Sequence, residues 1–220
     1  MRKCATTLEG EMTPAEHNFL LGLLGREKLP GPHLEVGTAA GGTLCAMMRC
    51  FNDETRPPFV VVDRMTYFPN QLDAVKMNLK RHGLDPGQVE FRVAMSGAAY
   101  REAAERGDGF DFILLDGCHK ILAVMSDLRW TRLLRVGGVI CLHDYSPKFP
   151  GVKLSVDRFL AGHSHFRILG RADSLIALRK ESASTKPEVS ALDRAYAIAM
   201  HVPLLTRRKL DKWRNKRRAA

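Results

Sequence analysis

The sequence predicts an α/β fold built on a doubly wound, mostly parallel seven-stranded sheet with a C-terminal antiparallel hairpin. Three observations predict it. Short apolar runs alternate five times with helical stretches between residues 33 and 160, the pattern of β-then-α units in a parallel sheet. The runs at 59–62 and 112–115 are continuously apolar, as strands covered on both faces are. The runs at 165–171 and 174–180 are too close together for a parallel crossover, which predicts the hairpin.

Each predicted element has its own local signal. The stretch "TPAEHNFLLGLLGRE" begins a helix, because Thr13 can cap it, Pro14 suits the first helical position and Glu16 completes a capping box. Gly25 and "LPGP" then end that helix. The next five strands are predicted at 33–38, 58–64, 89–95, 110–117 and 138–144. Helices are predicted at 42–51, 70–82, 98–106, 120–134 and 150–160.

Length and composition indicate one globular domain with small appendages. The 220 residues are 45% hydrophobic and 26% charged. A chain of this size can bury roughly 70% of its unfolded surface without a disulfide or structural metal. We expect a helix or cap over 1–32, a main domain over 33–180, and a segment over 181–220 that contains a linker, a short helix at about 188–200 and a basic tail.

Cysteine usage and hydropathy predict a soluble, cytoplasmic protein. None of the five cysteines belongs to a C-x-x-C pair, and unpaired thiols are typical of a reducing compartment. The N-terminus shows no signal peptide. No apolar run approaches the ~20 residues that a membrane span needs.

The net charge of +10 is concentrated at one end. Residues 206–220 hold eight Lys or Arg and one Asp, a net +7, which leaves +3 for the other 205 residues. Such a tail could bind RNA, a nucleic-acid partner or an acidic membrane surface. Leu210, Trp213 and Arg217 fall at helical spacing, so an amphipathic helix stays open. We nevertheless expect a solvated or disordered end.

Ligands of doubly wound sheets bind at the carboxyl ends of the strands. Polar residues recur at four of the five strand ends. The positions to inspect are Glu35 to Gly42, Asp63, Met95–Ser96, Asp116 to His119, and His143–Asp144.

The loop "EVGTAAGG" follows the first strand and opens a helix. Gly37 and Gly41 let the backbone turn sharply and approach a ligand. The spacing E-x-G-x-x-x-G differs from the G-x-G-x-x-G that binds a pyrophosphate, and the carboxylate of Glu35 suits a cationic ligand better. Asp63, at the end of the second strand, could accept hydrogen bonds from ribose hydroxyls or merely cap the next turn. Together these features point to an adenosine-containing ligand.

At these residues the sequence resembles the class I S-adenosylmethionine-dependent methyltransferases, over about residues 33 to 180. The resemblance implies the Rossmann-like fold of that family, a glycine loop that holds the methionine part of S-adenosylmethionine, and a second-strand acid that binds ribose. It implies that residues 94–96 lie near adenine. The cofactor-binding residues implied are Glu35, Gly37, Thr38, Gly41, Asp63, Arg64, Met95, Ser96 and Asp116.

The stretches "LLDGCHK" and "LHDY" end the fourth and fifth strands. Adjacent parallel strands would bring Asp116 and Asp144 together, where they could share a divalent cation. Oxygen ligands favour Mg²⁺, and His143 as a third ligand would favour Mn²⁺, Fe²⁺ or Zn²⁺. The alternative is that Asp116 touches only cofactor, or caps a helix, and that Asp144 caps its loop.

The local pattern resembles a narrower branch, the small-molecule and sugar O-methyltransferases with a D-G-x-H loop and an H-D strand end. That branch commonly has D-G-D-H-x-Y, whereas this chain has Cys118 and Ile121 at the second Asp and the aromatic position. His119 then becomes the candidate base, with Asp116 beside it in the catalytic set. A histidine that only hydrogen-bonds its own loop is the alternative.

These observations predict a methyltransferase that modifies an oxygen of a small molecule or sugar with S-adenosylmethionine, with or without a divalent metal. An alternative is a catalytically weak cofactor-binding protein that its basic tail recruits to RNA or a protein partner. An RNA methyltransferase would need a basic body, which the charge count disfavours. A homodimer stays open.

Overall fold

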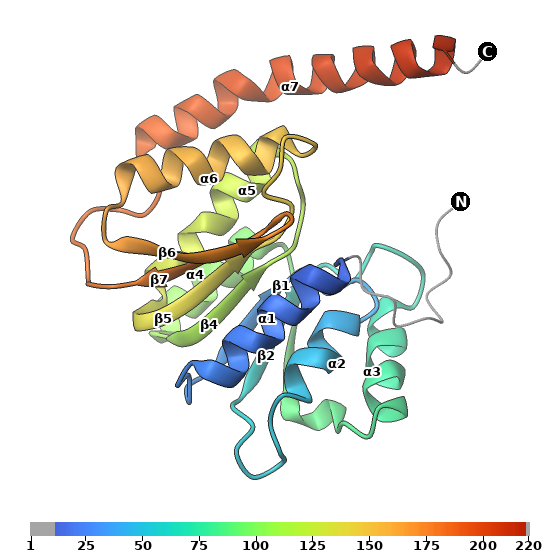
Figure 1. Cartoon of the computed structure of the whole chain (residues 1–220), viewed down its shortest axis with the longest axis vertical. Helices are drawn as coiled ribbons and strands as arrows, with labels where there is room; N and C mark the ends of the chain where they lie inside the picture. The colour runs from blue at the N-terminus through green and yellow to red at the C-terminus, as the bar shows by residue number, and fades with distance from the viewer. Residues whose placement is uncertain (1–11, 219–220) are drawn as a thin grey trace.

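The computed structural model describes residues 12–218, with side chains through residue 206. One seven-stranded sheet forms its centre, in the order β3-β2-β1-β4-β5-β7-β6 (Figure 1). β1 to β5 are parallel, and β7 runs antiparallel to both β5 and β6. The predicted fold class and its hairpin are confirmed. The strands are β1 (His33–Val36), β2 (Phe59–Asp63), β3 (Val89–Val93), β4 (Phe110–Leu115), β5 (Leu134–Leu142), β6 (Phe166–Ala172) and β7 (Leu175–Lys180).

Helices cover both faces of the sheet (Figure 1). The first three pack on one face, the next three on the other, and the last lies against α5 and α6. The helices are α1 (Pro14–Arg26), α2 (Gly42–Met48), α3 (Gln71–Arg81), α4 (Ser96–Arg106), α5 (Ile121–Asp127), α6 (Pro150–Gly162) and α7 (Ala191–Arg218).

The apolar central strands supply both cores. In β4, Phe112 and Leu114 join the cluster under α1 to α3, whereas Ile113 and Leu115 join the cluster under α4 to α6. Successive side chains of a strand point to opposite faces. A strand buried on both sides therefore needs an unbroken apolar run, which explains the pattern seen in the sequence.

Between residues 33 and 180, two predicted boundaries are wrong by four residues or more. α5 ends at Asp127 and a 3₁₀ turn (Leu128–Arg132) takes the place of the rest of the helix predicted over 120–134. β5 begins at Leu134, earlier than the predicted 138. The turn buries Trp130 completely, and its indole N–H donates to Ser96 Oγ at 3.0 Å. The 3₁₀ turn thus buries this large side chain and gives its indole N–H a partner. The chain then enters the sheet earlier than predicted.

The C-terminal helix is also longer than predicted. Instead of a short helix over about 188–200, α7 runs for 28 residues to Arg218. It begins with a capping box, because Ser190 Oγ accepts the Asp193 N–H (3.2 Å) and Asp193 Oδ2 accepts the Ser190 N–H (2.9 Å). Arg158 Nε of α6 donates to Asp193 Oδ1 at 2.6 Å. Within the described part of the chain, no helix is long and apolar enough to cross a membrane.

A buried charge anchors the segment predicted as a polar linker. Glu188 is only 4% exposed. Its carboxylate lies 3.5 Å from His163 Nε2, 3.6 Å from His165 Nε2 and 3.6 Å from Lys180 Nζ. These two histidines, which look isolated in the sequence, therefore share one carboxylate.

Candidate functional site

The carboxyl ends of β1, β2, β4 and β5 meet at one edge of the sheet. In the observed register Val36 pairs with Val62 and Leu115, and Leu115 pairs with Leu142. A small cavity opens there between residues 115–119, the end of β5, helix α5 and the first turn of α6. This edge is where parallel α/β sheets bind ligands.

The loop after β1 needs glycine at two positions. Gly37 has φ +87°, and a Cβ there would lie 2.4 Å from the Asp116 carbonyl oxygen. Gly41 has φ +83°, and its Cβ would lie 3.0 Å from Val75 Cγ1. The loop therefore presses bare backbone against the end of β4 and leaves no room for a side chain at Gly37.

Glu35 lies beneath this loop. Its side chain is 1% exposed, and Oε2 has no hydrogen-bond partner among the described residues. Burial raises the pKa of Glu35 to about 8. The hydroxyl of Thr38 is likewise buried without a described partner. Among the described residues, Glu35 Oε2 and the Thr38 hydroxyl are thus both buried under the glycine loop without a hydrogen bond of normal geometry.

Asp63 ties the end of β2 to the same loop. Its carboxylate accepts the backbone N–H groups of Thr38 (3.0 Å) and Met65 (2.6 Å). Arg64 beside it is exposed. After β3, the strand next to β2, Met95 is 59% exposed and immediately precedes α4. Ser96 Oγ accepts the indole N–H of Trp130.

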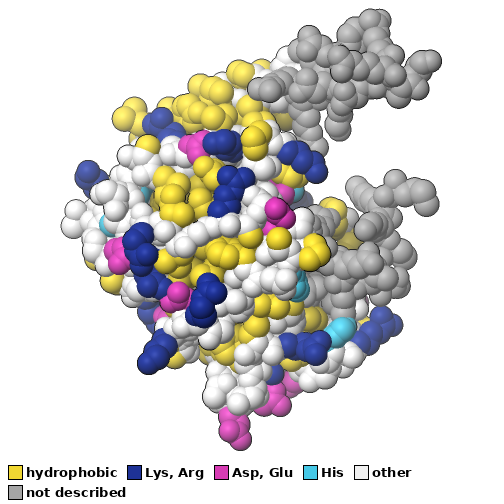
Figure 2. All heavy atoms as spheres, in the orientation of Figure 1, with side chains coloured by type: hydrophobic (Ala, Val, Ile, Leu, Met, Phe, Trp, Pro, Cys, Tyr) yellow, Lys and Arg dark blue, Asp and Glu magenta, His cyan; other side chains and the backbone are white. Residues whose placement is uncertain are grey.

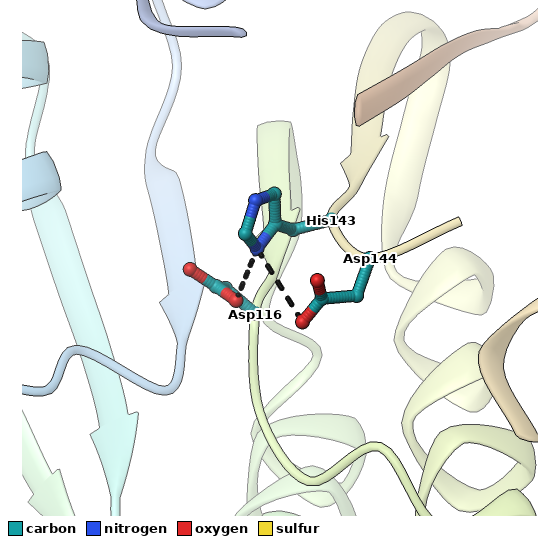
Figure 3. Close-up of side chains that lie close together, drawn as sticks. All are labelled: Asp116, His143 and Asp144. Carbon is teal, nitrogen blue, oxygen red and sulfur yellow. Dashed lines mark hydrogen bonds and ion pairs between the residues drawn. The ribbon is translucent and has the colours of Figure 1, made fainter. Parts of the chain in front are cut away.

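A cluster of acids and imidazoles occupies the ends of β4 and β5. His143 Nδ1 lies 2.9 Å from Asp116 Oδ1 and 3.7 Å from Asp144 Oδ2 (Figure 3). Asp144 adopts φ +60°, a left-handed backbone that is uncommon outside glycine. Its Oδ2 also contacts His119 Nε2 at 2.7 Å, and the ring of His119 packs on Phe149 at 4.6 Å.

Both ring nitrogens of His143 lie close to carboxylate oxygens. Burial alone would lower its pKa, but the hydrogen bond to Asp116 and the charges of Asp116, Asp144 and Glu16 raise the pKa to about 9. A pKa above neutrality favours an imidazolium, whose two N–H groups would donate to Asp116 and Glu16.

Glu16 is the site residue that sequence reasoning missed. Its Oε2 lies 3.3 Å from His143 Nε2, and its Oε1 accepts the backbone N–H (2.9 Å) and the hydroxyl (2.5 Å) of Ser174. Burial acts to raise its pKa, but hydrogen bonds from Ser174 and Thr13 lower it to about 2. The predicted capping box is present, but the same carboxylate also joins α1 to β5 and to the hairpin turn. In the sequence, the helix cap was the only feature that indicated a role for Glu16.

A family model described as a methyltransferase domain matches residues 34–145, which hold the glycine loop, Asp63 and the cluster. The chain belongs to this family. The predicted resemblance to class I methyltransferases is confirmed. No functionally curated protein matches the sequence.

Solved structures share the methyltransferase fold at low identity. The O-methyltransferase from Bacillus cereus in complex with SAH is 18% identical, with a TM-score of 0.61 over 78% of this chain and 84% of its own. TomG from Streptomyces achromogenes, an O-methyltransferase in complex with SAM, is 17% identical, with a TM-score of 0.63 over 78% and 82%. CalS11, a TDP-rhamnose 3′-O-methyltransferase, is 19% identical, with a TM-score of 0.59 over 74% and 77%.

The methyltransferase departs from the D-G-D-H-x-Y pattern at two positions, one of which lines the cavity while the other is buried in the core. Cys118 is exposed and lines the cavity. Ile121 is 1% exposed and packs in the core between sheet and helices, so this position contributes nothing to the cavity. The basic side chains from residue 207 onward lie outside the described side chains.

Asp116, His143 and Asp144 form a group that could hold a divalent cation. One ligand atom from each lies within 4.8 Å of the others, and two carboxylates with an imidazole are a suitable donor set. Asp116 and Asp144 fit a cation as they stand. His143 could ligate only after losing a proton, because a protonated nitrogen has no free lone pair.

Proposed function

We propose that this methyltransferase transfers the methyl group of S-adenosylmethionine to an oxygen of a small molecule or sugar. One observation carries the proposal: the His119–Asp144 pair lies at the sheet edge where the glycine loop presses directly on Asp116. A group suited to accept a proton is thus next to the loop suited to hold a methyl donor.

The donor side is supported by buried polar groups that have no hydrogen-bond partner among the described residues. The loop that Gly37 and Gly41 shape would receive the methionine part, with Glu35 and Thr38 beneath it. The carboxylate of Asp63, partly exposed, would accept hydrogen bonds from ribose hydroxyls. The bound donor supplies a methyl group on a positively charged sulfur, and holding the two reactants in line provides much of the rate. Arg64, Met95 and Ser96 complete the proposed set near adenine.

His119 would act as the general base. Its Nε2–H would donate to Asp144 Oδ2, which fixes the ring and leaves Nδ1 free to accept the proton of the acceptor hydroxyl. The side chain is 37% exposed, so an acceptor can reach it. Asp144 would stabilise the positive charge that forms on the ring.

Metal assistance is part of the proposal. Asp116 and Asp144 would hold Mg²⁺ or another divalent cation, with His143 as a third ligand if it loses its proton. A bound cation would lower the pKa of the acceptor hydroxyl. Replacing Cys118 by Asp should tighten Mn²⁺ binding, measured by calorimetry, because it adds a carboxylate to the cavity that Asp116 also lines. Unchanged Mn²⁺ affinity would count against a metal at this cluster.

The acceptor class is supported by the named relatives, one of which is a TDP-rhamnose 3′-O-methyltransferase. A panel of hydroxyl-bearing small molecules and nucleotide-linked sugars, followed by release of S-adenosylhomocysteine, would test it. His119→Gln should lower turnover of an active acceptor by about 10²- to 10⁴-fold. Turnover within tenfold of wild type would exclude His119 as the base.

Calorimetry with S-adenosylmethionine tests the donor site. Gly37→Ala should abolish measurable binding, because the added methyl group would lie 2.4 Å from a backbone oxygen in a left-handed residue. Gly25→Ala is the matched control, since its Cβ would meet nothing within 4 Å, and it should bind normally. Wild-type affinity in Gly37→Ala would overturn the proposed donor site.

A further inference from the structure

The outward face of α7 is apolar. Leu192 is 74% exposed, and Ile198 and Val202 are each 65% exposed. Exposed Ala195 and Ala199 lie between them, at spacings that share one side of a helix. Figure 2 shows hydrophobic side chains gathered at the top of the molecule, over α7.

The inward face of α7 packs against the main body of the protein. Ala197 is 1% exposed, and Tyr196, Met200 and Leu204 pack against the core cluster under α4 to α6. The guanidinium of Arg158 covers the ring of Tyr196 at 4.5 Å. A helix on the surface of a globular protein normally turns a polar face outward. The apolar stripe of Leu192, Ile198 and Val202 therefore contributes little to the packing of the fold.

The continuation of the same helix is strongly basic. α7 runs to Arg218, and residues 206–220 carry eight Lys or Arg against one Asp. The other 205 residues have a net charge of only +3. An apolar helix face combined with a dense positive charge is the composition of helices that lie in the interface of anionic membranes.

We infer that α7 docks this enzyme on an anionic lipid surface, with Leu192, Ile198 and Val202 entering the headgroup boundary. A lipid surface offers both negative charge and an apolar layer. RNA offers the charge but gives the stripe nothing to bury. A second copy offers an apolar stripe but adds more positive charge.

Flotation of the full-length protein with vesicles tests this inference. The protein should float with phosphatidylcholine vesicles that contain roughly 30% phosphatidylglycerol and not with phosphatidylcholine alone, because the tail needs anionic headgroups. The double variant Ile198→Asp/Val202→Asp should lose at least tenfold in vesicle affinity. Met77→Asp is the control, because Met77 is another exposed apolar residue, at 51%, on α3, and it should bind like wild type.

Circular dichroism and thermal unfolding establish that the double variant is folded, which its untouched inward contacts lead us to expect. Equal flotation of the double variant and wild type would overturn a role for the apolar stripe. Tight binding to polyuridine RNA without vesicle binding would assign the helix to nucleic acid. A wild-type dimer that the double variant abolishes, without vesicle binding, would assign the stripe to a second copy.

Discussion

Glu35 is a buried carboxyl whose ionisation opposes folding. In the unfolded chain it ionises near pH 4.5, but in the folded protein only near pH 8. Between these values the folded state holds one proton more, so stability falls as pH rises, by about 1.4 kcal/mol per pH unit. Glu35→Gln, which cannot ionise, should therefore stabilise the ligand-free protein by a few kcal/mol at pH 8 and by almost nothing at pH 4.5.

Urea unfolding at the two pH values measures this difference. Glu105→Gln is a suitable control, because Glu105 is exposed on α4 and should change the free energy of unfolding little at either pH. A Glu35→Gln effect of the same size at both pH values would contradict a raised pKa for Glu35.

Glu16→Gln should destabilise the fold by about 2–4 kcal/mol at pH 7, because it leaves a buried imidazolium with one carboxylate fewer. His143 has a raised pKa, so its pairing stabilises the fold fully below pH 6.5 and loses this effect as pH rises through about 9. The deficit of Glu16→Gln should accordingly shrink by pH 10. Unfolding at both pH values, with exposed Glu102→Gln as the control, would reveal it, and a constant deficit would argue against a charged His143.

Individual site residues were predictable where the strand end itself carries the signal. Asp116 and His143 each directly follow an apolar run, Asp144 comes next after His143, and parallel strands bring such ends together. Glu16 lies 127 residues from His143, and its local role as a helix cap is complete without the contact. Only tertiary packing of α1 on the sheet reveals the second role.

Among the connecting elements, the segment before α7 depends on one ion cluster. Glu188→Gln should cost about 3–5 kcal/mol of unfolding free energy, because it leaves Lys180, itself 5% exposed, without its carboxylate. Glu181→Gln is the neighbouring control, since Glu181 pairs with Arg167 in an exposed ion pair and should cost at most about 1 kcal/mol. Equal losses in a urea titration would show that the buried cluster contributes no more than a surface pair.

Strands were predicted more accurately than the ends of helices. Apolar runs must sit in the sheet wherever two layers of helices cover it, so their positions are strongly constrained. Helix ends depend on local competition. The predicted helix over 120–134 gave way to the burial of Trp130, and α7 continues past Pro203, which removes one backbone hydrogen bond without ending the helix.

At the scale of the whole molecule, removal of the basic end of α7 should change neither the stability of the main body nor its cofactor binding. The described contacts of α7 with the body, at Asp193, Tyr196, Ala197, Met200 and Leu204, all precede Thr206. Truncation after Thr206 should leave the free energy of unfolding within about 0.5 kcal/mol of wild type and leave calorimetric binding of S-adenosylmethionine unchanged. A large loss of either would mean that the removed residues support the body.

The carboxylate of Glu16 joins three distant parts of the polypeptide, since it touches His143 and Ser174 as well as its own helix start. Synthesis proceeds from the N-terminus, so this junction cannot close until the hairpin has left the ribosome. A nascent chain that stops short of residue 174 has the glycine loop and both strand-end acids, yet Glu16 still lacks its Ser174 partner. Assembly of the proposed site is therefore coupled to synthesis of the hairpin, and we expect a proteolytic fragment without the hairpin to be inactive.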